Sequence, residues 1–291
     1  MNTTRHPKIG LALGSGGAKG LAHIGVLKVL EKHTIPIDFI AGSSIGALIG
    51  GMYASEKNVS KIEEQINDFT RMKGISLIDF TMRGGILKGI KVENYFNEII
   101  KDDTIESLSI PFAAVATDFN TAQPVVFRKG SVVKAIRASI AVPGIFQPLK
   151  YHNHLLADGG LVNPVPVDVL YQMGADVIIA VNLDSVYIDK PIEDIPALTI
   201  IPLNTVGILR HTLSKQSIKG ADVIIEPPDK YHIGLLGWKY FIDNEKAQDI
   251  IRLGEMSAEK ALPQIHKAIK HFHYRKSYRG KLHSFFQKLK K

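Results

Sequence analysis

The pentapeptide Gly-Ser-Ser-Ile-Gly at 42–46 places a serine in a sharp turn directly after a short apolar run. A G-x-S-x-G pattern between a strand and a helix is typical of a nucleophile elbow, which presents the serine hydroxyl at the end of the strand. Gly42 and Gly46 let the chain double back without clashes, and the start of the next helix places partial positive charge near the reacting group. The spacing predicts Ser44 as a nucleophile, with neighbouring Ser43 facing away from the site.

A second glycine-rich turn, Gly-Ser-Gly-Gly-Ala-Lys-Gly at 14–20, follows the apolar run 8–13. A phosphate-binding P-loop would need Ser or Thr after Lys19, where this chain has Gly20. A dinucleotide fingerprint would need glycine in place of Lys19 and an acidic residue at the end of the second strand, and both are missing. A tight connection without a binding role is one remaining interpretation. The nearby nucleophile favours the other, an oxyanion hole whose candidate N–H donors are Gly14, Gly16, Gly17 and Ala18.

A serine hydroxyl needs a proton acceptor, and Asp158 is the candidate that lies at the end of a predicted strand. It begins the tripeptide Asp158-Gly159-Gly160. Of the eleven histidines, His152 and His154 lie nearest in sequence, but they are expected to be exposed on a hairpin. A carboxylate with an unperturbed pKa of about 3.9 is a poor base for serine and needs partial desolvation.

The elements that position these residues alternate between strand and helix. The expected strands cover residues 8–13, 37–41, 112–116, 125–128, 155–157, 177–183 and 222–225. The expected helices cover residues 20–33, 58–70, 132–139, 167–173 and 244–269, and a further helix runs from the serine turn to about residue 54. Residues 71–92 are predicted to form an irregular loop. This order predicts an α/β protein with a mostly parallel sheet, in one domain over residues 1–269.

The composition is that of an ordinary globular protein, with 45% hydrophobic and 22% charged residues in a chain of 291. Cysteine is absent, which excludes disulfides and thiolate metal sites and fits a reducing compartment. The longest uncharged stretch, 39–55, is interrupted by glycines, so we expect no transmembrane segment. The N-terminal apolar run is too short for a signal peptide.

The net charge of +8 comes from the C-terminal end of the chain. The predicted tail, residues 270–291, is basic, and Leu282, Phe285, Phe286 and Leu289 form one apolar stripe at helical spacing. Such a segment can lie in an anionic membrane interface. Packing on the body of the protein, a solvated end and nucleic-acid binding are the alternatives. We expect a cytoplasmic protein with peripheral contact at the inner face of the membrane and no nucleic-acid partner.

Taken together, the motifs resemble the patatin-like phospholipase family, in particular its bacterial members related to neuropathy target esterase. Besides the two turns and the Asp158 tripeptide, similar stretches lie at 84–89, 116–118, 138–148 and 161–169. The resemblance covers about residues 8–183. Lys19 departs from it, because family members often have arginine there, and a lysine lacks the forked donor geometry.

The resemblance implies a three-layer α/β/α fold and a Ser–Asp dyad, Ser44 and Asp158, in place of a triad. It also implies an oxyanion hole around Gly16 and Gly17, and hydrolysis of a lipid or lysolipid acyl ester through an acyl-enzyme without a metal or cofactor. Two other functions stay open. One is an α/β-hydrolase with a Ser–His–Asp triad, and the other is a lipid-binding regulatory protein with vestigial activity.

Overall fold

The computed structural model describes residues 6–71, 79–81, 84–100, 104–186, 201–231 and 239–288, and the statements below concern these residues. Its centre is an eight-stranded sheet with the order β10-β9-β1-β2-β4-β8-β7, to which β5 is added beside β4. The strands of this sheet are β1 (Ile9–Leu13), β2 (Phe39–Ser43), β4 (Phe112–Asp118), β5 (Gln123–Phe127), β7 (Leu149–Tyr151), β8 (His154–Asp158), β9 (Val177–Val181) and β10 (Val223–Ile225).

Five of these strands, from β10 to β4 along the sheet, run parallel. The strands β5, β7 and β8 add antiparallel pairs at one side. Two short strands, β3 (Gly85–Leu87) and β6 (Gly144–Phe146), pair with each other in a second, two-stranded parallel sheet. Because the carboxyl ends of parallel strands lie at one edge, the turns that follow β1, β2 and β9 meet there. This edge carries the candidate site.

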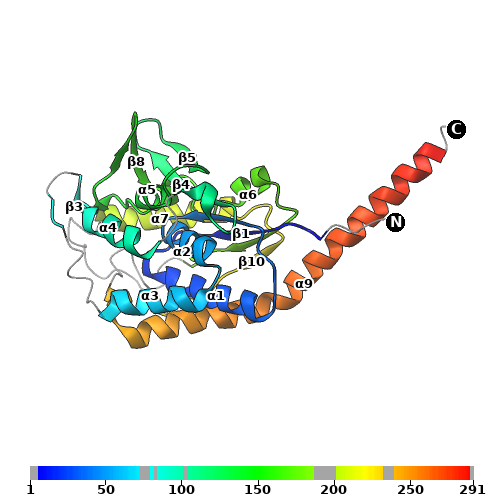
Figure 1. Cartoon of the computed structure of the whole chain (residues 1–291), viewed down its shortest axis with the longest axis horizontal. Helices are drawn as coiled ribbons and strands as arrows, with labels where there is room; N and C mark the ends of the chain where they lie inside the picture. Colours follow the sequence, from blue (N-terminus) through cyan, green and yellow to red (C-terminus); the bar gives the residue numbers. More distant parts are fainter. Residues whose placement is uncertain are drawn as a thin grey trace.

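Helices cover both faces of the sheet, as Figure 1 shows. The helices are α1 (Leu21–Lys32), α2 (Ile45–Glu56), α3 (Val59–Arg71), α4 (Ile90–Ile99), α5 (Val132–Ser139), α6 (Val167–Met173), α7 (Ile201–Ser217), α8 (Lys239–Ile242) and α9 (Asn244–Lys288), with single 3-10 turns η1 (Gly17–Gly20), η3 (Ile105–Ser107) and η4 (Gly159–Leu161). The result is the three-layer α/β/α arrangement that the family resemblance implies.

The two faces of the sheet bury different side chains, because successive residues of a strand point in opposite directions. In β1, Leu11 and Leu13 contribute to the larger core, which includes α1, α2, α3, α5 and α9. Ala12 of β1 and Ala180 of β9 face the other core, where Val167 and Leu170 of α6 cover them. Small residues on this second face let α6 pack close to the sheet.

The last helix, α9, packs against α1 and then continues past residue 270, the boundary predicted for the tail. The two helices approach closely at a glycine, since a Cβ on Gly25 would lie 2.0 Å from the carbonyl oxygen of Ile251. In Figure 1 the C-terminal part of α9 extends beyond the other elements. Among the helices described here, none combines the length and apolar character needed to cross a membrane.

The predicted elements agree with the structure through most of the chain, with several differences. The second strand runs from Phe39 to Ser43, two residues later than 37–41. The predicted irregular loop 71–92 contains β3 and the start of α4, and its residues 72–78 and 82–83 lie outside the described part. The helix α7 was not predicted.

Candidate active site

The turn after β2 has the geometry of a nucleophile elbow. Ser44 adopts φ 55° and ψ −124°, a conformation that costs a non-glycine residue about 1–3 kcal/mol. A Cβ on Gly42 would lie 2.3 Å from the carbonyl oxygen of Gly46, and one on Gly46 would lie 2.0 Å from that of Leu13. Both positions therefore require glycine. Ser43 is fully buried, and its Oγ lies against Gly159.

The hydroxyl of Ser44 and the carboxylate of Asp158 are in direct contact: Ser44 Oγ donates to Asp158 Oδ2 at 2.5 Å. The sheet register brings them together across one strand. Ser43 pairs with Val115 in β4, and Asp158 pairs with the next residue, Ala116. The residue after Ser43 is thus level with Asp158, although 114 positions separate the two in sequence.

Asp158 is buried, and its other contacts hold the carboxylate in place. The N–H of Gly160 donates to Oδ1 at 2.7 Å, and the hydroxyl of Thr117 donates to the main-chain oxygen of Asp158 at 2.7 Å. Burial raises the pKa of Asp158 to about 6, although the hydrogen bond from Ser44 and the charge of Arg210 oppose this. Such a carboxylate is a stronger base than an exposed aspartate and is still mostly ionised at neutral pH.

Ser139 supports the elbow and was not among the predicted site residues. Its Oγ accepts the main-chain N–H of Ser44 at 2.8 Å and donates to the carbonyl oxygen of Val115 at 2.6 Å. The side chain lies at the end of α5 and is fully buried. The segment 138–148 contributed to the family resemblance, but nothing in the sequence pointed to this residue in particular.

The loop after β1 passes beside the elbow, and its N–H groups differ in availability. Gly14 was among the candidate oxyanion donors predicted from the sequence. In the structure the N–H of Gly14 donates to the carbonyl oxygen of Val181 at 3.0 Å, so it is not free for this role. No main-chain acceptor within the described residues takes the N–H of Gly16 or Gly17. Gly17 has a φ of 57°, which favours glycine, and with Ala18 it begins η1.

His23 fixes the start of this loop from the α1 side. It is fully buried, and its Nε2 lies 2.8 Å from the carbonyl oxygen of Gly14. Burial lowers the pKa of His23 to about 4, so the ring is neutral at pH 7 and Nε2 donates to this carbonyl. The loop is therefore held at Gly14 from two sides, by Val181 and by His23.

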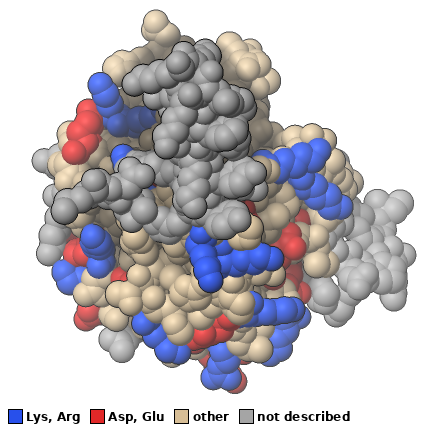
Figure 2. Space-filling model, turned by 90° about the vertical axis from the view of Figure 1, so that its right-hand side faces the viewer, with Lys and Arg blue, Asp and Glu red and all other residues tan. Residues whose placement is uncertain are grey.

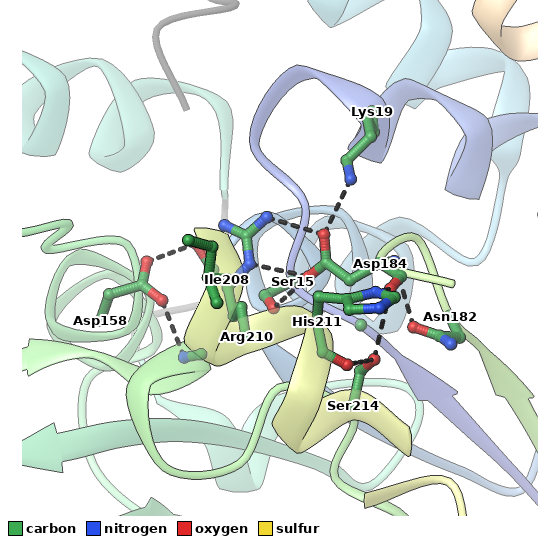
Figure 3. A network of polar contacts seen from close by, with 12 residues as sticks. Ser15, Lys19, Asp158, Asn182, Asp184, Ile208, Arg210, His211 and Ser214 are labelled. Atoms are coloured by element: carbon green, nitrogen blue, oxygen red, sulfur yellow. Dashed lines mark hydrogen bonds and ion pairs between the residues drawn. The ribbon is translucent and has the colours of Figure 1, made fainter. Parts of the chain in front are cut away.

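A buried network of charges lies behind the loop, and Figure 3 shows its side chains converging on Asp184. Arg210 donates to the Asp184 carboxylate through two nitrogens, at 2.7 and 2.8 Å, and Lys19 Nζ donates at 2.8 Å. Burial would raise the pKa of Asp184, but the charges of Arg210 and Lys19 hold it well below its usual range. Neither Asp184 nor Arg210 was predicted as a site residue from the sequence, because both lie outside the recognisable motifs.

The histidines closest to Asp158 in sequence are engaged elsewhere. His152 is exposed in the turn between β7 and β8, and His154 Nδ1 lies 2.9 Å from Asp118 Oδ2. His211 of α7 contacts the main-chain oxygen of Asp184 at 2.6 Å. The proton of the Ser44 hydroxyl therefore points to a carboxylate oxygen and not to an imidazole.

Comparisons of sequence identify relatives, and the family match covers the part of the chain that holds Ser44 and Asp158. A family model described as patatin-like phospholipase matches residues 11–171. An uncharacterized NTE family protein of Mycobacterium tuberculosis is 40% identical over 179 residues, which are 61% of this chain and 49% of that protein. Neuropathy target esterase sws of Drosophila melanogaster is 35% identical over 183 residues, 61% of this chain and 13% of that protein. The match thus spans about half of the first relative and less of the second.

Among solved structures, VipD from Legionella pneumophila has a similar fold. The similarity has a TM-score of 0.50 and covers 89% of this chain and 67% of VipD, at 11% sequence identity. At this level of identity the comparison concerns the fold alone.

Proposed function

The chain belongs to the patatin-like phospholipase family, and from this premise we propose that it is a serine acyl hydrolase that cleaves fatty-acyl esters of lipids. The observation that carries the proposal is the 2.5 Å hydrogen bond from Ser44 to Asp158 at a strained elbow. A strained turn persists where the surrounding structure holds it, and such turns concentrate at functional sites.

In the first step, Ser44 Oγ attacks the carbonyl carbon of the ester while Asp158 accepts the hydroxyl proton. The negative charge that develops on the carbonyl oxygen is stabilised by N–H groups of the loop, for which Gly16, Gly17 and Ala18 are the candidates. The bond to the alcohol then breaks, and Asp158 returns the proton to the leaving oxygen. The product is an acyl-enzyme on Ser44.

In the second step, a water molecule attacks the acyl carbon with Asp158 again as the base. The tetrahedral intermediate collapses, the fatty acid leaves, and Ser44 regains its proton. A base with a pKa of about 6 suits this cycle, because it is ionised at pH 7 yet holds a proton better than an exposed aspartate does. The same carboxylate thus acts as base, then acid, in each half of the reaction.

The proposed substrates are phospholipids or lysophospholipids, in line with the descriptions of the family and of its relatives. A triad enzyme is the less favoured alternative, because the Ser44 hydroxyl already has a carboxylate acceptor. A regulatory protein without activity is also less favoured, since it would have no need to maintain the strained φ of 55° at Ser44.

We further propose that the C-terminal segment 270–291 acts as a distinct basic tail that contacts an anionic membrane surface from the cytoplasmic side. On the face shown in Figure 2, the basic side chains of the body are interspersed with acidic ones. The excess of positive charge in the sequence belongs to the tail, because eight Lys and Arg with no acidic residue occupy 270–291. Such a segment would bring the active site to its substrate.

The test is a panel of phospholipids, lysophospholipids and simple esters, assayed with wild type, Ser44→Ala and Asp158→Asn. Wild type is expected to release fatty acid from at least one lipid class, and both variants are expected to lose activity by a factor of about 10³ or more. A fluorophosphonate probe should label wild type but not Ser44→Ala. Activity near the wild-type level in either variant would exclude the dyad.

A further inference from the structure

Arg210 is a buried cation beside the proposed catalytic pair, and the two steps above do not use it. Arg210 is 5% exposed and reaches inward from α7, whose neighbouring residues Ile208 and Leu209 are about half exposed, at 49% and 52%. Nε donates to Asp184 Oδ2 at 2.7 Å, and Nη2 donates to Asp184 Oδ1 at 2.8 Å. A two-bond pair of this kind fixes the direction of the guanidinium as well as its charge.

The first role of Arg210 concerns Asp158, the proposed base. A Cβ placed on Gly160 would lie 2.9 Å from each of Arg210 Cδ, Asp158 Oδ1 and Ser15 Oγ, so the side chains of Arg210 and Asp158 both lie against Gly160. The positive charge of Arg210 favours the ionised form of Asp158 and opposes the effect of burial on its pKa. Without this charge, a carboxylate so deeply buried would hold its proton to a higher pH.

The second role concerns the loop that would form the oxyanion hole, to which Asp184 connects Arg210. Lys19 Nζ donates to Asp184 Oδ1 at 2.8 Å, and Ser15 Oγ donates to Oδ2 at 3.5 Å. Ser15 and Lys19 flank the three candidate donor residues at 16–18. Figure 3 shows Lys19, Ser15 and Arg210 around the same carboxylate.

We propose that Arg210, held by Asp184, is a positioning residue that places its positive charge beside Asp158 and, through Asp184, fixes the oxyanion loop. This role rests on the proposed function of Ser44 and Asp158. Both Arg210 and Asp184 lie outside the segment 11–171 that the family model matches. A part of the chain beyond the matched segment therefore completes the site.

The charges around Asp158 make this role measurable, because they have opposite signs. Arg210 of α7 lowers its pKa, whereas Asp184, which follows β9, raises it. The uncharged partners of the carboxylate are the hydroxyl of Ser44 and the N–H of Gly160. Lys19 faces Asp184 and also lies 4.0 Å from Asp229. Removal of Arg210 should thus raise the pKa of the base, and removal of the charge on Asp184 should lower it.

The experiment measures the rate of fluorophosphonate labelling of Ser44 between pH 4.5 and 8.5. This rate should fall at acid pH as Asp158 becomes protonated. In Arg210→Gln the fall of the labelling rate at acid pH, the acid limb, should move up by about one pH unit, which reduces labelling at pH 5 by about tenfold. In Asp184→Asn the limb should move down, and in Arg210→Lys, which keeps the charge, it should stay near the wild-type position. Arg252→Gln, an exposed change on α9, is the matched control and should follow wild type.

A merely structural role would lower the labelling rate without moving the acid limb, and that result in folded Arg210→Gln would overturn the proposal. Melting curves establish that each variant is folded. Should Arg210→Gln not fold, Asp184→Asn decides, and a limb that stays in place or moves up in this variant overturns the proposal. Absence of labelling in wild type at every pH would instead refute the proposed function of Ser44, and with it this inference.

Discussion

The hydroxyl of Ser139 connects the nucleophile turn to the neighbouring strand, since it accepts the N–H of Ser44 at 2.8 Å and donates to the carbonyl oxygen of Val115 at 2.6 Å. Both main-chain groups would lose a buried partner without it. The α5 helix thereby holds the residue with the strained φ in the sheet. This contact is short enough, and buried enough, to make the elbow depend on a residue 95 positions away in sequence.

We predict that Ser139→Ala destabilises the fold by about 1–3 kcal/mol, the cost of leaving buried polar groups without partners. Activity should fall as well, because Ser44 loses the contact that orients its main chain. Denaturant unfolding and ester hydrolysis measure the two effects. Ser257→Ala is the matched control, since that hydroxyl only donates to the carbonyl oxygen of Leu253 within α9. Equal stabilities of the two variants would contradict this role of Ser139.

A dyad predicts that no histidine acts as the base for Ser44. His152→Ala and His154→Ala should each retain activity within a few-fold of wild type, because His152 is exposed in a turn and His154 contacts Asp118. Release of fatty acid from the best lipid of the panel is the measurement. A loss comparable with that of Asp158→Asn, in folded protein, would favour the triad interpretation.

The burial of Asp158 should cost stability as it supports activity. Its pKa is about 6 in the folded protein and 3.8 as the ordinary value, so the folded state binds the proton more tightly. The ionised carboxylate of Asp158 therefore lowers the free energy of unfolding by about 2–3 kcal/mol above pH 6. This loss disappears as the pH falls to 3.8. Asp158→Asn should be more stable than wild type at pH 7, by up to this amount, and the difference should shrink at pH 4. Denaturant titrations at both pH values measure it, and a less stable Asp158→Asn at pH 7 would contradict the expected cost.

His23 should have the opposite dependence on pH. Its pKa is about 4 in the folded protein against 6.5 ordinarily, so the unfolded chain takes the proton first as the pH falls. The stability that a neutral His23 contributes is complete above pH 6.5 and is lost toward pH 4, a total of about 3 kcal/mol. The difference in unfolding free energy between wild type and His23→Gln should therefore change across this range. For His152→Gln, an exposed control, the unfolding free energy should change with pH as it does in wild type. If His23→Gln also changed in the same way as wild type, the low pKa of His23 would be refuted.

The site motifs were recognisable from sequence because close backbone contacts leave room only for glycine at their key positions. A Cβ on Gly42 would meet Gly46 in the same turn, whereas one on Gly46 would meet Leu13 and one on Gly159 would meet Val115. These requirements leave a residue pattern that can be recognised without the fold. The direct contact between Ser44 and Asp158, in contrast, depends on the register of β2, β4 and β8, which no local pattern encodes.

The helix α7 was missed because its pattern is inverted. Ile208 and Leu209 are exposed, whereas Arg210 and Ser214 are buried. A rule that places apolar side chains inside fails here, because the partner that makes burial of Arg210 favourable is Asp184, which follows a distant strand. In α4, similarly, the first N–H groups are capped by the carboxylate of Asp79, ten or more residues upstream.

The basic tail offers the last prediction, and the structure indicates where to cut. Phe272 packs on the edge of the larger core, so deletion of residues 273–291 removes most of the basic and apolar tail but leaves this contact in place. The truncated protein should keep its melting temperature and its hydrolysis of soluble esters. Its binding to vesicles with anionic lipid should fall by tenfold or more at low salt, since each Lys or Arg near such a surface contributes about 1 kcal/mol.

Two further variants separate charge from apolar contact in the tail. Replacement of Lys288, Lys290 and Lys291 by Gln should weaken binding mainly at low salt, because salt screens charge. Replacement of Phe285 and Phe286 by Ser should weaken it at low and high salt alike, because insertion of apolar side chains is not screened. If the truncated protein binds vesicles as well as wild type at both salt concentrations, the tail does not attach this protein to membranes, and a lipid substrate would reach Ser44 by another surface.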